Sequence, residues 1–267
     1  MFFVCFVLTL QANNSECFRC FRYLGDRQKS RQLNRCLRNA EAVCKIYDMV
    51  VIKTIRFTIA AVEKLMVLNS DLAVIFLVRD PRASIWSRMN VFNKPKKQNL
   101  LPSTKRYCKR LKTDLLDARQ LFQLYPNILR FIRYEELADR PVHVFRKIYE
   151  FLRLNWTDGI ESETKAQTGS FNKTVLRNSS GAKPPRKKVR ANHYSLTRTD
   201  SSAAANHWRA SIPFRISQTV EQQCAEMMTI LGFHKFKTLK TLRDQSLSSR
   251  GRFKYVEDLP FLGGNLS

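Results

Sequence analysis

The segment Asp71–Asn90, DLAVIFLVRDPRASIWSRMN, decides how the rest of the chain is interpreted. It opens with a continuous apolar run, Leu72–Val78, which is rich in β-branched residues and typical of a fully buried strand in a parallel sheet. Asp80 and Pro81 follow as a good helix N-cap and a good first helical residue, and Ala83–Met89 continues as a helix. The pattern predicts a strand, a sharp turn and a helix, and parallel sheets bind ligands at such turns.

Two side chains near this turn are candidates for binding an anion. The N-terminus of a helix presents unpaired N–H groups and favours negative charge. Arg79, at the end of the strand, carries a planar guanidinium that suits phosphate. Ser87 lies about two helical turns beyond Asp80 and therefore on the same face. The alternative is an ordinary surface arginine at a strand end and an ordinary helical serine.

The motif LVRDPRASIWSR, residues 77–88, resembles the 3′-phosphate-binding segment of sulfotransferases that use PAPS (3′-phosphoadenylyl sulfate). It is most similar to that of the Golgi carbohydrate 6-O-sulfotransferases. The resemblance implies an α/β, P-loop-like sulfotransferase fold, a parallel sheet flanked by helices, with transfer of a sulfuryl group from PAPS to a sugar hydroxyl and no metal. In that family the matching arginine and serine hold the 3′-phosphate, so Arg79 and Ser87 are the expected cofactor-binding residues.

A second segment agrees with the resemblance. Met49–Ile55, MVVIKTI, predicts another buried strand, and Lys53–Arg56 matches a Lys-Thr-x-Arg pattern of the carbohydrate enzymes. The resemblance implies that Lys53 steadies the transferring sulfuryl group as a catalytic residue, and that Arg56 contacts the acidic glycan or its sulfate. A strand-end lysine in solvent remains the alternative for Lys53.

Two later segments agree as well. Asn127–Tyr134 predicts a third strand that runs into Tyr134-Glu135-Glu136-Leu137, similar to the Tyr-Glu-Asp-Leu of the family, whose tyrosine lies near the adenine. The alternative is that Tyr134 and Glu135 only cap the next helix. Arg198–Trp208 resembles the closing segment of the family, which implies a second 3′-phosphate contact from Arg198, whereas Trp208 is expected to pack.

Apolar periodicity predicts the helices around the sheet, and polar composition predicts the loops. The expected helices are Thr58–Leu68, Tyr107–Tyr125, Pro141–Leu154 and Pro213–Leu231, the last with Gly232 as its C-cap. The expected loops are Val91–Ser103 and Thr157–Asp200, and a basic stretch without clear pattern starts at Lys235. We therefore divide the chain into an apolar N-terminus (1–15), a partial sulfotransferase domain (16–236) and a basic tail (237–267).

The charge balance points to an anionic partner. The 267 residues contain 47 Lys and Arg against 22 Asp and Glu, a net charge of +25. Such a balance indicates a polyanionic partner or substrate, or an acidic membrane surface. No zinc-finger or RNA-binding signature favours nucleic acid. We therefore expect an acidic or neutral glycan as acceptor.

Cysteines and sequons favour an oxidising compartment. Four of the seven cysteines lie between Cys17 and Cys44, and their spacing differs from the usual paired CxxC zinc site. Disulfides are the favoured interpretation, with the pairing left open. Five N-x-Ser/Thr sequons agree with a secreted or lumenal protein. The family resemblance implies the Golgi lumen and a membrane anchor preceding the domain.

The first part of the expected domain is missing from the pattern. Met1–Leu10 is too short to span a bilayer, and both a signal-peptide core and the remnant of a truncated segment fit it. No Arg-x-Gly-x-Ser/Thr loop for the 5′-phosphosulfate precedes Met49, so the resemblance covers roughly Cys36–Phe236. The first βα unit and the anchor are predicted to be absent. A catalytically inactive, polyanion-binding protein is the alternative function.

Overall fold

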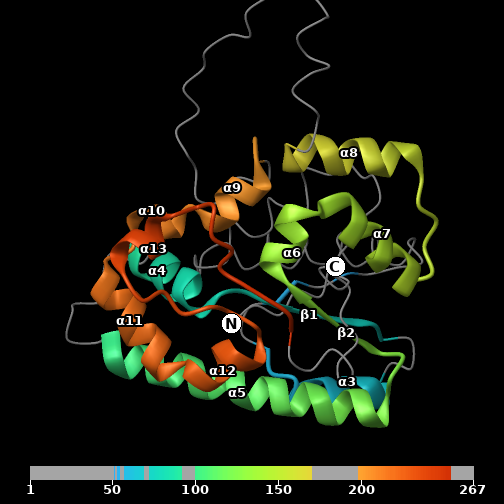
Figure 1. Ribbon diagram of the computed structural model, residues 1–267. Helices are drawn as coiled ribbons and strands as arrows, with labels where there is room; N and C mark the ends of the chain where they lie inside the picture. Colours follow the sequence, from blue (N-terminus) through green and yellow to red (C-terminus); the bar gives the residue numbers. More distant parts are fainter. Residues whose placement is uncertain are drawn as a thin grey trace, which may run out of the picture. The chain divides into compact units, whose positions relative to one another are not determined.

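The computed structural model describes residues 51, 53–54, 57–68, 72–91, 100–169 and 198–253 (Figure 1). The helices and strands below all belong to the larger of two compact units, the one that contains Ile55–Ser267. The cysteines between Cys17 and Cys44 and the predicted site residue Arg56 lie outside the described residues.

Two parallel strands form the sheet in the described part of the chain. β1 (Val74–Val78) pairs with β2 (Leu129–Arg133) in a register that runs from Val74 opposite Leu129 to Val78 opposite Arg133. Every residue of β1 is buried, as expected for an apolar, β-branched run. The predicted α/β fold with a parallel sheet is confirmed. Of the predicted strand Met49–Ile55, Val51, Lys53 and Thr54 are described, and none of them is in a strand.

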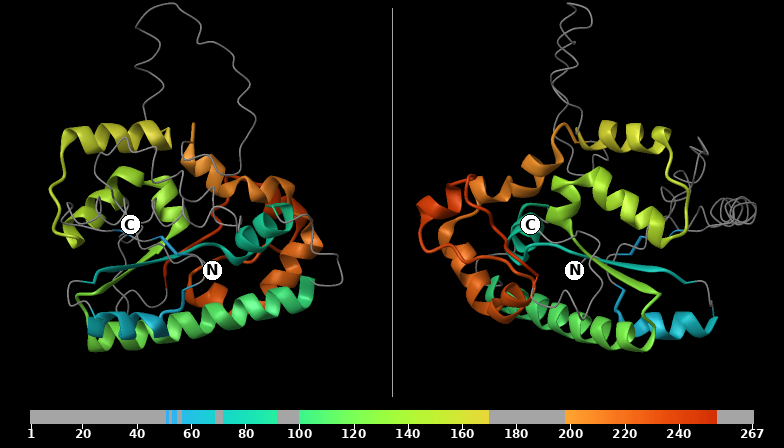
Figure 2. Two further views of the ribbon diagram at one scale, coloured as in Figure 1. Left: turned by 180° about the vertical axis from the view of Figure 1, so that it is seen from behind. Right: turned by 45° about the vertical axis from the view of Figure 1, so that its right-hand side comes forward.

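Helices flank the strands on both sides (Figures 1 and 2). The long helix α5 (Leu100–Leu124) lies along one side, where α3 (Ala60–Leu68) packs against it. α6 (Tyr134–Asp139) continues directly from β2 on the other side and contacts α7 (Pro141–Phe151). These helices confirm the helical periodicity of Thr58–Leu68, Tyr107–Tyr125 and Pro141–Leu154.

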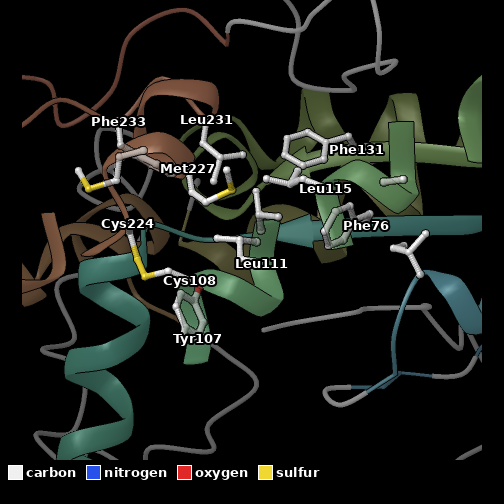
Figure 3. Close-up of a cluster of buried hydrophobic side chains, with 14 of the residues drawn as sticks. Phe76, Tyr107, Cys108, Leu111, Leu115, Phe131, Cys224, Met227, Leu231 and Phe233 are labelled. Carbon is white, nitrogen blue, oxygen red and sulfur yellow. A yellow bond between two sulfur atoms is a disulfide. The ribbon is translucent and has the colours of Figure 1, made fainter. Parts of the chain in front are cut away.

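The main core lies between α5, the strands and the last helices. The ring of Phe76 in β1 meets that of Phe131 in β2 edge-on, with centroids 5.6 Å apart, and Phe131 stacks on Phe253 at 4.8 Å. Figure 3 shows this cluster, in which side chains from distant segments converge. Each fully buried side chain of this size contributes about 1.5–3 kcal/mol by leaving water. The cluster also contains Leu111 and Leu115 of α5, Met227 of α12, and Leu231 and Phe233, which follow α12.

A disulfide crosses this core. Cys108 of α5 is bonded to Cys224, which separates α11 (Phe214–Gln223) from α12 (Ala225–Ile230). The sequence predicted one helix, Pro213–Leu231, but the backbone leaves helical geometry at Cys224, with φ −104° and ψ 16°. The predicted glycine lies one residue beyond the C-cap: Leu231 is the C-cap of α12, and Gly232 follows with a left-handed φ of 70°.

Two predicted loops are partly helical. Leu100–Ser103, within the expected loop Val91–Ser103, forms the first turn of α5, where Pro102 is tolerated because an early helical N–H needs no partner. α8 (Asp158–Thr168) occupies the start of the expected loop Thr157–Asp200. Its signals are polar: the Thr157 hydroxyl accepts the Ile160 N–H, and Gly169 ends the helix with φ 69°. α8 has no buried residue, so apolar periodicity could not reveal it.

One further expectation from the sequence pattern is wrong. The stretch after Lys235 was predicted to lack a pattern. It instead forms α13 (Leu239–Arg243), which buries Leu242.

Candidate functional site

The carboxyl ends of the two strands bring four residues together. Because β1 and β2 are parallel and Val78 is opposite Arg133, the residues that follow β1 lie beside those that follow β2. The Arg79 guanidinium lies 4.8 Å from the centroid of the Tyr134 ring. The Asp80 N–H donates to Glu135 Oε1 at 3.0 Å. We call Arg79, Asp80, Tyr134 and Glu135 the strand-end cluster.

The turn after β1 is closed by the protein's own carboxylates. Asp80 Oδ1 accepts the Arg82 N–H at 2.8 Å, which confirms Asp80 as the N-cap of α4 (Pro81–Val91). The Asp80 N–H is held by Glu135, and Pro81 has no N–H. The N–H groups of Asp80 and Arg82 are therefore not free for an anion, contrary to the expectation of unpaired N–H groups at this turn.

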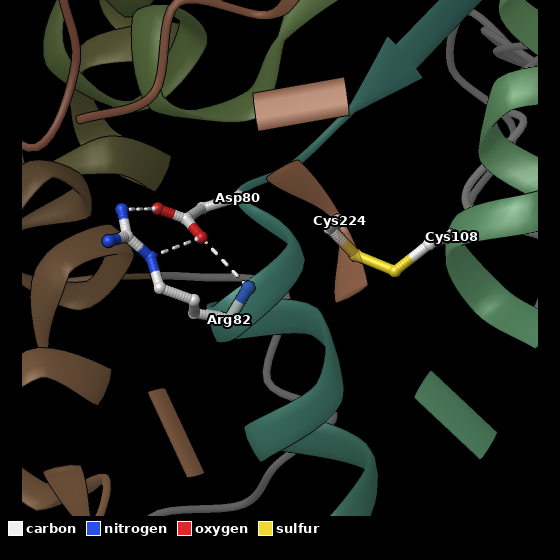
Figure 4. The surroundings of a disulfide bond; sticks show 4 residues. All are labelled: Asp80, Arg82, Cys108 and Cys224. Atoms are coloured by element: carbon white, nitrogen blue, oxygen red, sulfur yellow. Dashed lines mark hydrogen bonds and ion pairs between the residues drawn. A yellow bond between two sulfur atoms is a disulfide. The ribbon is translucent and has the colours of Figure 1, made fainter. Parts of the chain in front are cut away.

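Arg82 anchors α4 to the C-terminal part of the domain. Its side chain is fully buried and binds Asp80 through two nitrogens, at 3.0 and 2.7 Å (Figure 4). A third nitrogen binds Glu221 of α11 at 2.6 Å. The guanidinium also lies 5.0 Å from the Trp208 ring and 4.8 Å from the Phe236 ring. The role of Arg82 was not predicted, because its burial depends on Glu221, 139 residues later in the chain.

Arg79 and Glu135 keep polar atoms without partners. Arg79 is half-buried, and its Nε has no hydrogen-bond partner among the described residues. Glu135 is 1% exposed, and its Oε2 likewise has none there. Burial raises the pKa of Glu135 to about 7, the nearby Asp80 charge adds to this, and Arg79 opposes it. The cluster thus combines a cation with a spare donor, an aromatic ring and a carboxyl group that titrates near neutrality.

Ser87 lies further along α4, and Tyr107 lies in α5. Ser87 is half-buried on α4, where part of its surface remains exposed. Tyr107 of α5 is buried, and this burial raises its pKa. The guanidinium of Arg88 lies 5.0 Å from the Tyr107 ring. Tyr107 therefore joins α5 to α4.

The remaining predicted site residues lie elsewhere in the chain. Lys53 is exposed. Arg198 is half-buried, and its backbone N–H donates to Gln167 O at 2.7 Å, three residues before α9 (Ser201–Asn206). α9 packs on α6, where the Ser201 hydroxyl donates to Ala138 O at 2.5 Å. Trp208, in α10 (Trp208–Ser211), is buried and packs, as predicted.

Within the described ranges no group of three or more His, Cys, Asp or Glu is arranged to hold a metal ion. None of the helices in the described ranges combines the length and apolar character that crossing a membrane requires.

Comparisons with known proteins agree with the resemblance noted above. A model of the "Sulfotransferase family" matches residues 9–158, more than half of the chain. Carbohydrate sulfotransferase 3 of Mus musculus is 29% identical over 235 residues, which cover 80% of this chain and 46% of that protein. Carbohydrate sulfotransferase 1 of Danio rerio is 28% identical over 257 residues, 88% of this chain and 54% of that protein. The chain thus spans about half the length of the curated relatives it matches.

Proposed function

Because the chain belongs to the sulfotransferase family, we propose that it transfers a sulfuryl group from PAPS to a glycan hydroxyl, at the 6-position of a sugar. The relatives it matches are named carbohydrate sulfotransferases, which supports a sugar acceptor. The alternative of an inactive polyanion-binding protein has no such support.

The observation that carries this proposal is the strand-end cluster. Arg79 is half-buried against Tyr134 and keeps its Nε unpaired among the described residues. A guanidinium in such a partly desolvated place binds phosphate more strongly than one in water. In the proposed complex Arg79 and Ser87 hold the 3′-phosphate of PAPS, and the Tyr134 ring lies along the adenine.

The other predicted cations are assigned to the transfer, the donor and the acceptor. The bond from sulfur to the phosphate oxygen breaks while a new S–O bond forms to the sugar oxygen, and the hydroxyl proton passes to a base. By analogy with phosphoryl transfer, cations stabilise the charge on the leaving phosphate and on the sulfuryl oxygens. Lys53 is proposed for this role, Arg198 for a second 3′-phosphate contact and Arg56 for the glycan. We do not propose Glu135 as this base, because its side chain is only 1% exposed, and we name no other residue for the role.

The proposed place of action is the lumen of the Golgi. The Cys108–Cys224 disulfide supports an oxidising compartment. The sequon at Asn155 agrees, since Asn155 is exposed at the surface before α8. Membrane association through a segment preceding the domain is part of the same proposal.

The test measures the affinity of the chain for two nucleotides that differ only in the 3′-phosphate. Arg79→Ala should weaken binding of adenosine 3′,5′-bisphosphate about 10- to 100-fold, because one or two charge-assisted hydrogen bonds are lost. Binding of adenosine 5′-monophosphate should change little. Arg88→Ala, on the helix that follows Arg79, is the matched control and should leave both affinities unchanged. Equal losses for the two nucleotides in Arg79→Ala would refute the assignment.

A further inference from the structure

Positive charge is concentrated in one stretch of the chain. Between Pro81 and Thr113 there are ten Lys and Arg and no Asp or Glu. Three of these cations, Lys105, Arg106 and Lys109, are exposed on the N-terminal half of α5 and have no acidic partner among the described residues. We call these three residues the α5 basic stripe. Lys112 differs, since it pairs with Glu226 of α12 at 2.7 Å.

The stability of α5 does not explain this arrangement. Lys105 and Lys109 are four residues apart, as are Arg106 and Arg110, and like charges at that spacing repel on a helix. The second half of α5, by contrast, mixes signs, with Asp114, Asp117 and Arg119. A bound polyanion would relieve the repulsion within the stripe.

The opposite face of the same turns is fixed in the core. Tyr107, Cys108 and Leu111 are 3–6% exposed, and Figure 3 shows them facing the buried cluster. Cys108 is bonded to Cys224, so this half of α5 is covalently tied to the C-terminal helices. The stripe therefore stands on a rigid platform, which lowers the entropy lost when it binds a ligand. Tyr107 further connects this platform to Arg88 of α4.

We propose that the α5 basic stripe is a binding surface for an acidic polysaccharide that carries sulfate or carboxylate groups. The apolar face of α5 is buried in the core, unlike that of a membrane-surface helix. The stripe has no exposed aromatic residue on which bases would stack. The choice of a polysaccharide rests on the proposed function, but the binding itself needs neither PAPS nor transfer.

The experiment compares two triple variants that lose the same three charges. Lys105→Gln/Arg106→Gln/Lys109→Gln removes the stripe, and Lys235→Gln/Lys237→Gln/Lys240→Gln removes three exposed lysines near α13. Binding of each chain to immobilised heparin and to chondroitin sulfate is measured without nucleotide. The stripe variant should bind about tenfold more weakly than wild type, and the loss should shrink at high salt. The control should stay within about twofold of wild type.

Three results separate this inference from its competitors. Equal losses in the two triple variants overturn it, because binding would then follow net charge alone. A stripe-dependent preference for vesicles of phosphatidylserine, or for single-stranded DNA, overturns the polysaccharide as occupant. Arg79→Ala should keep its heparin affinity, so that failure of donor binding and failure of the stripe are read out independently. Thermal unfolding of every variant confirms that the fold is retained.

Discussion

Removing the disulfide between Cys108 and Cys224 should destabilise the domain strongly. The bond closes a loop with a sequence separation of 116 residues. The chain-entropy relation for a loop of that size gives roughly 16 cal/mol/K, or about 5 kcal/mol at 25 °C. For a domain of this length that corresponds to a fall in melting temperature of about 10–20 °C. Both cysteines are buried, so replacement by alanine avoids placing a hydroxyl in the core.

The assay compares the two single alanine variants with the double variant by denaturant unfolding without reductant. Either single change breaks the bond, so each should cost nearly as much as the double variant, apart from small packing losses. If the sulfur atoms contributed only packing, the two single losses would instead add to give the double loss. Counting free thiols by mass spectrometry checks that the wild-type bond is formed. The other five cysteines are untouched, which reduction with dithiothreitol would not allow.

Additive single losses, or a double loss below about 1 kcal/mol, would refute the reasoning. The same bond also predicts where the protein matures. Expression in a reducing cytosol should give a chain whose unfolding midpoint matches that of the double variant, because the bond does not persist there.

Two further predictions concern buried charges. Arg82→Met should lower the free energy of unfolding by about 3–5 kcal/mol, because Asp80 and Glu221 lose their buried partner. The control Arg88→Met should lower it by about 1 kcal/mol or less, as measured by denaturant unfolding. Equal losses in the two variants would contradict the role of Arg82. Folding raises the pKa of Glu135 from 4.5 to about 7, so the folded state binds the proton more tightly than the unfolded state. The free energy of unfolding should therefore fall by up to about 3 kcal/mol as the pH rises from below 4.5 through 7. Glu135→Gln should flatten this part of the pH profile, while the contribution of Asp114, whose pKa burial raises to about 6, remains.

The strands and the first turn of the site could be predicted because their signals are local. An apolar, β-branched run predicts β1, and Asp80-Pro81 predicts the start of α4. Parallel pairing of the strands then places Arg79 beside Tyr134, although 55 residues separate them in the sequence. The resemblance to a family supplied the phosphate role of Arg79. No pattern in the chain could supply it, since an isolated strand-end arginine is common.

What the sequence did not reveal depends on distant partners. The burial of Arg82 requires Glu221, 139 residues later, and the pairing of Cys108 depends on Cys224 meeting it across the core. A single basic residue in a predicted helix is interpreted as exposed to solvent, because the sequence pattern does not show which distant acidic residue it pairs with. The same holds for the stretch after Lys235. Its Arg250 binds Glu136 and Asp139, and these contacts, rather than periodicity, hold the segment in place.

These distant contacts make the candidate site depend on the C-terminal helices. The N-cap of α4 is held by Glu135, and its second residue, Arg82, is held by Glu221 of α11. The disulfide fixes α5 to the junction of α11 and α12, while Tyr107 of α5 carries Arg88 of α4. α4 is therefore held at three points by residues outside the motif that identifies it. A fragment that ended at residue 158, where the family match ends, would retain Arg79 and Glu135 but lose Glu221, and with Cys224 it would lose the disulfide that fixes α5. The position of Arg79 is thus a property of the whole described domain and not of the motif alone.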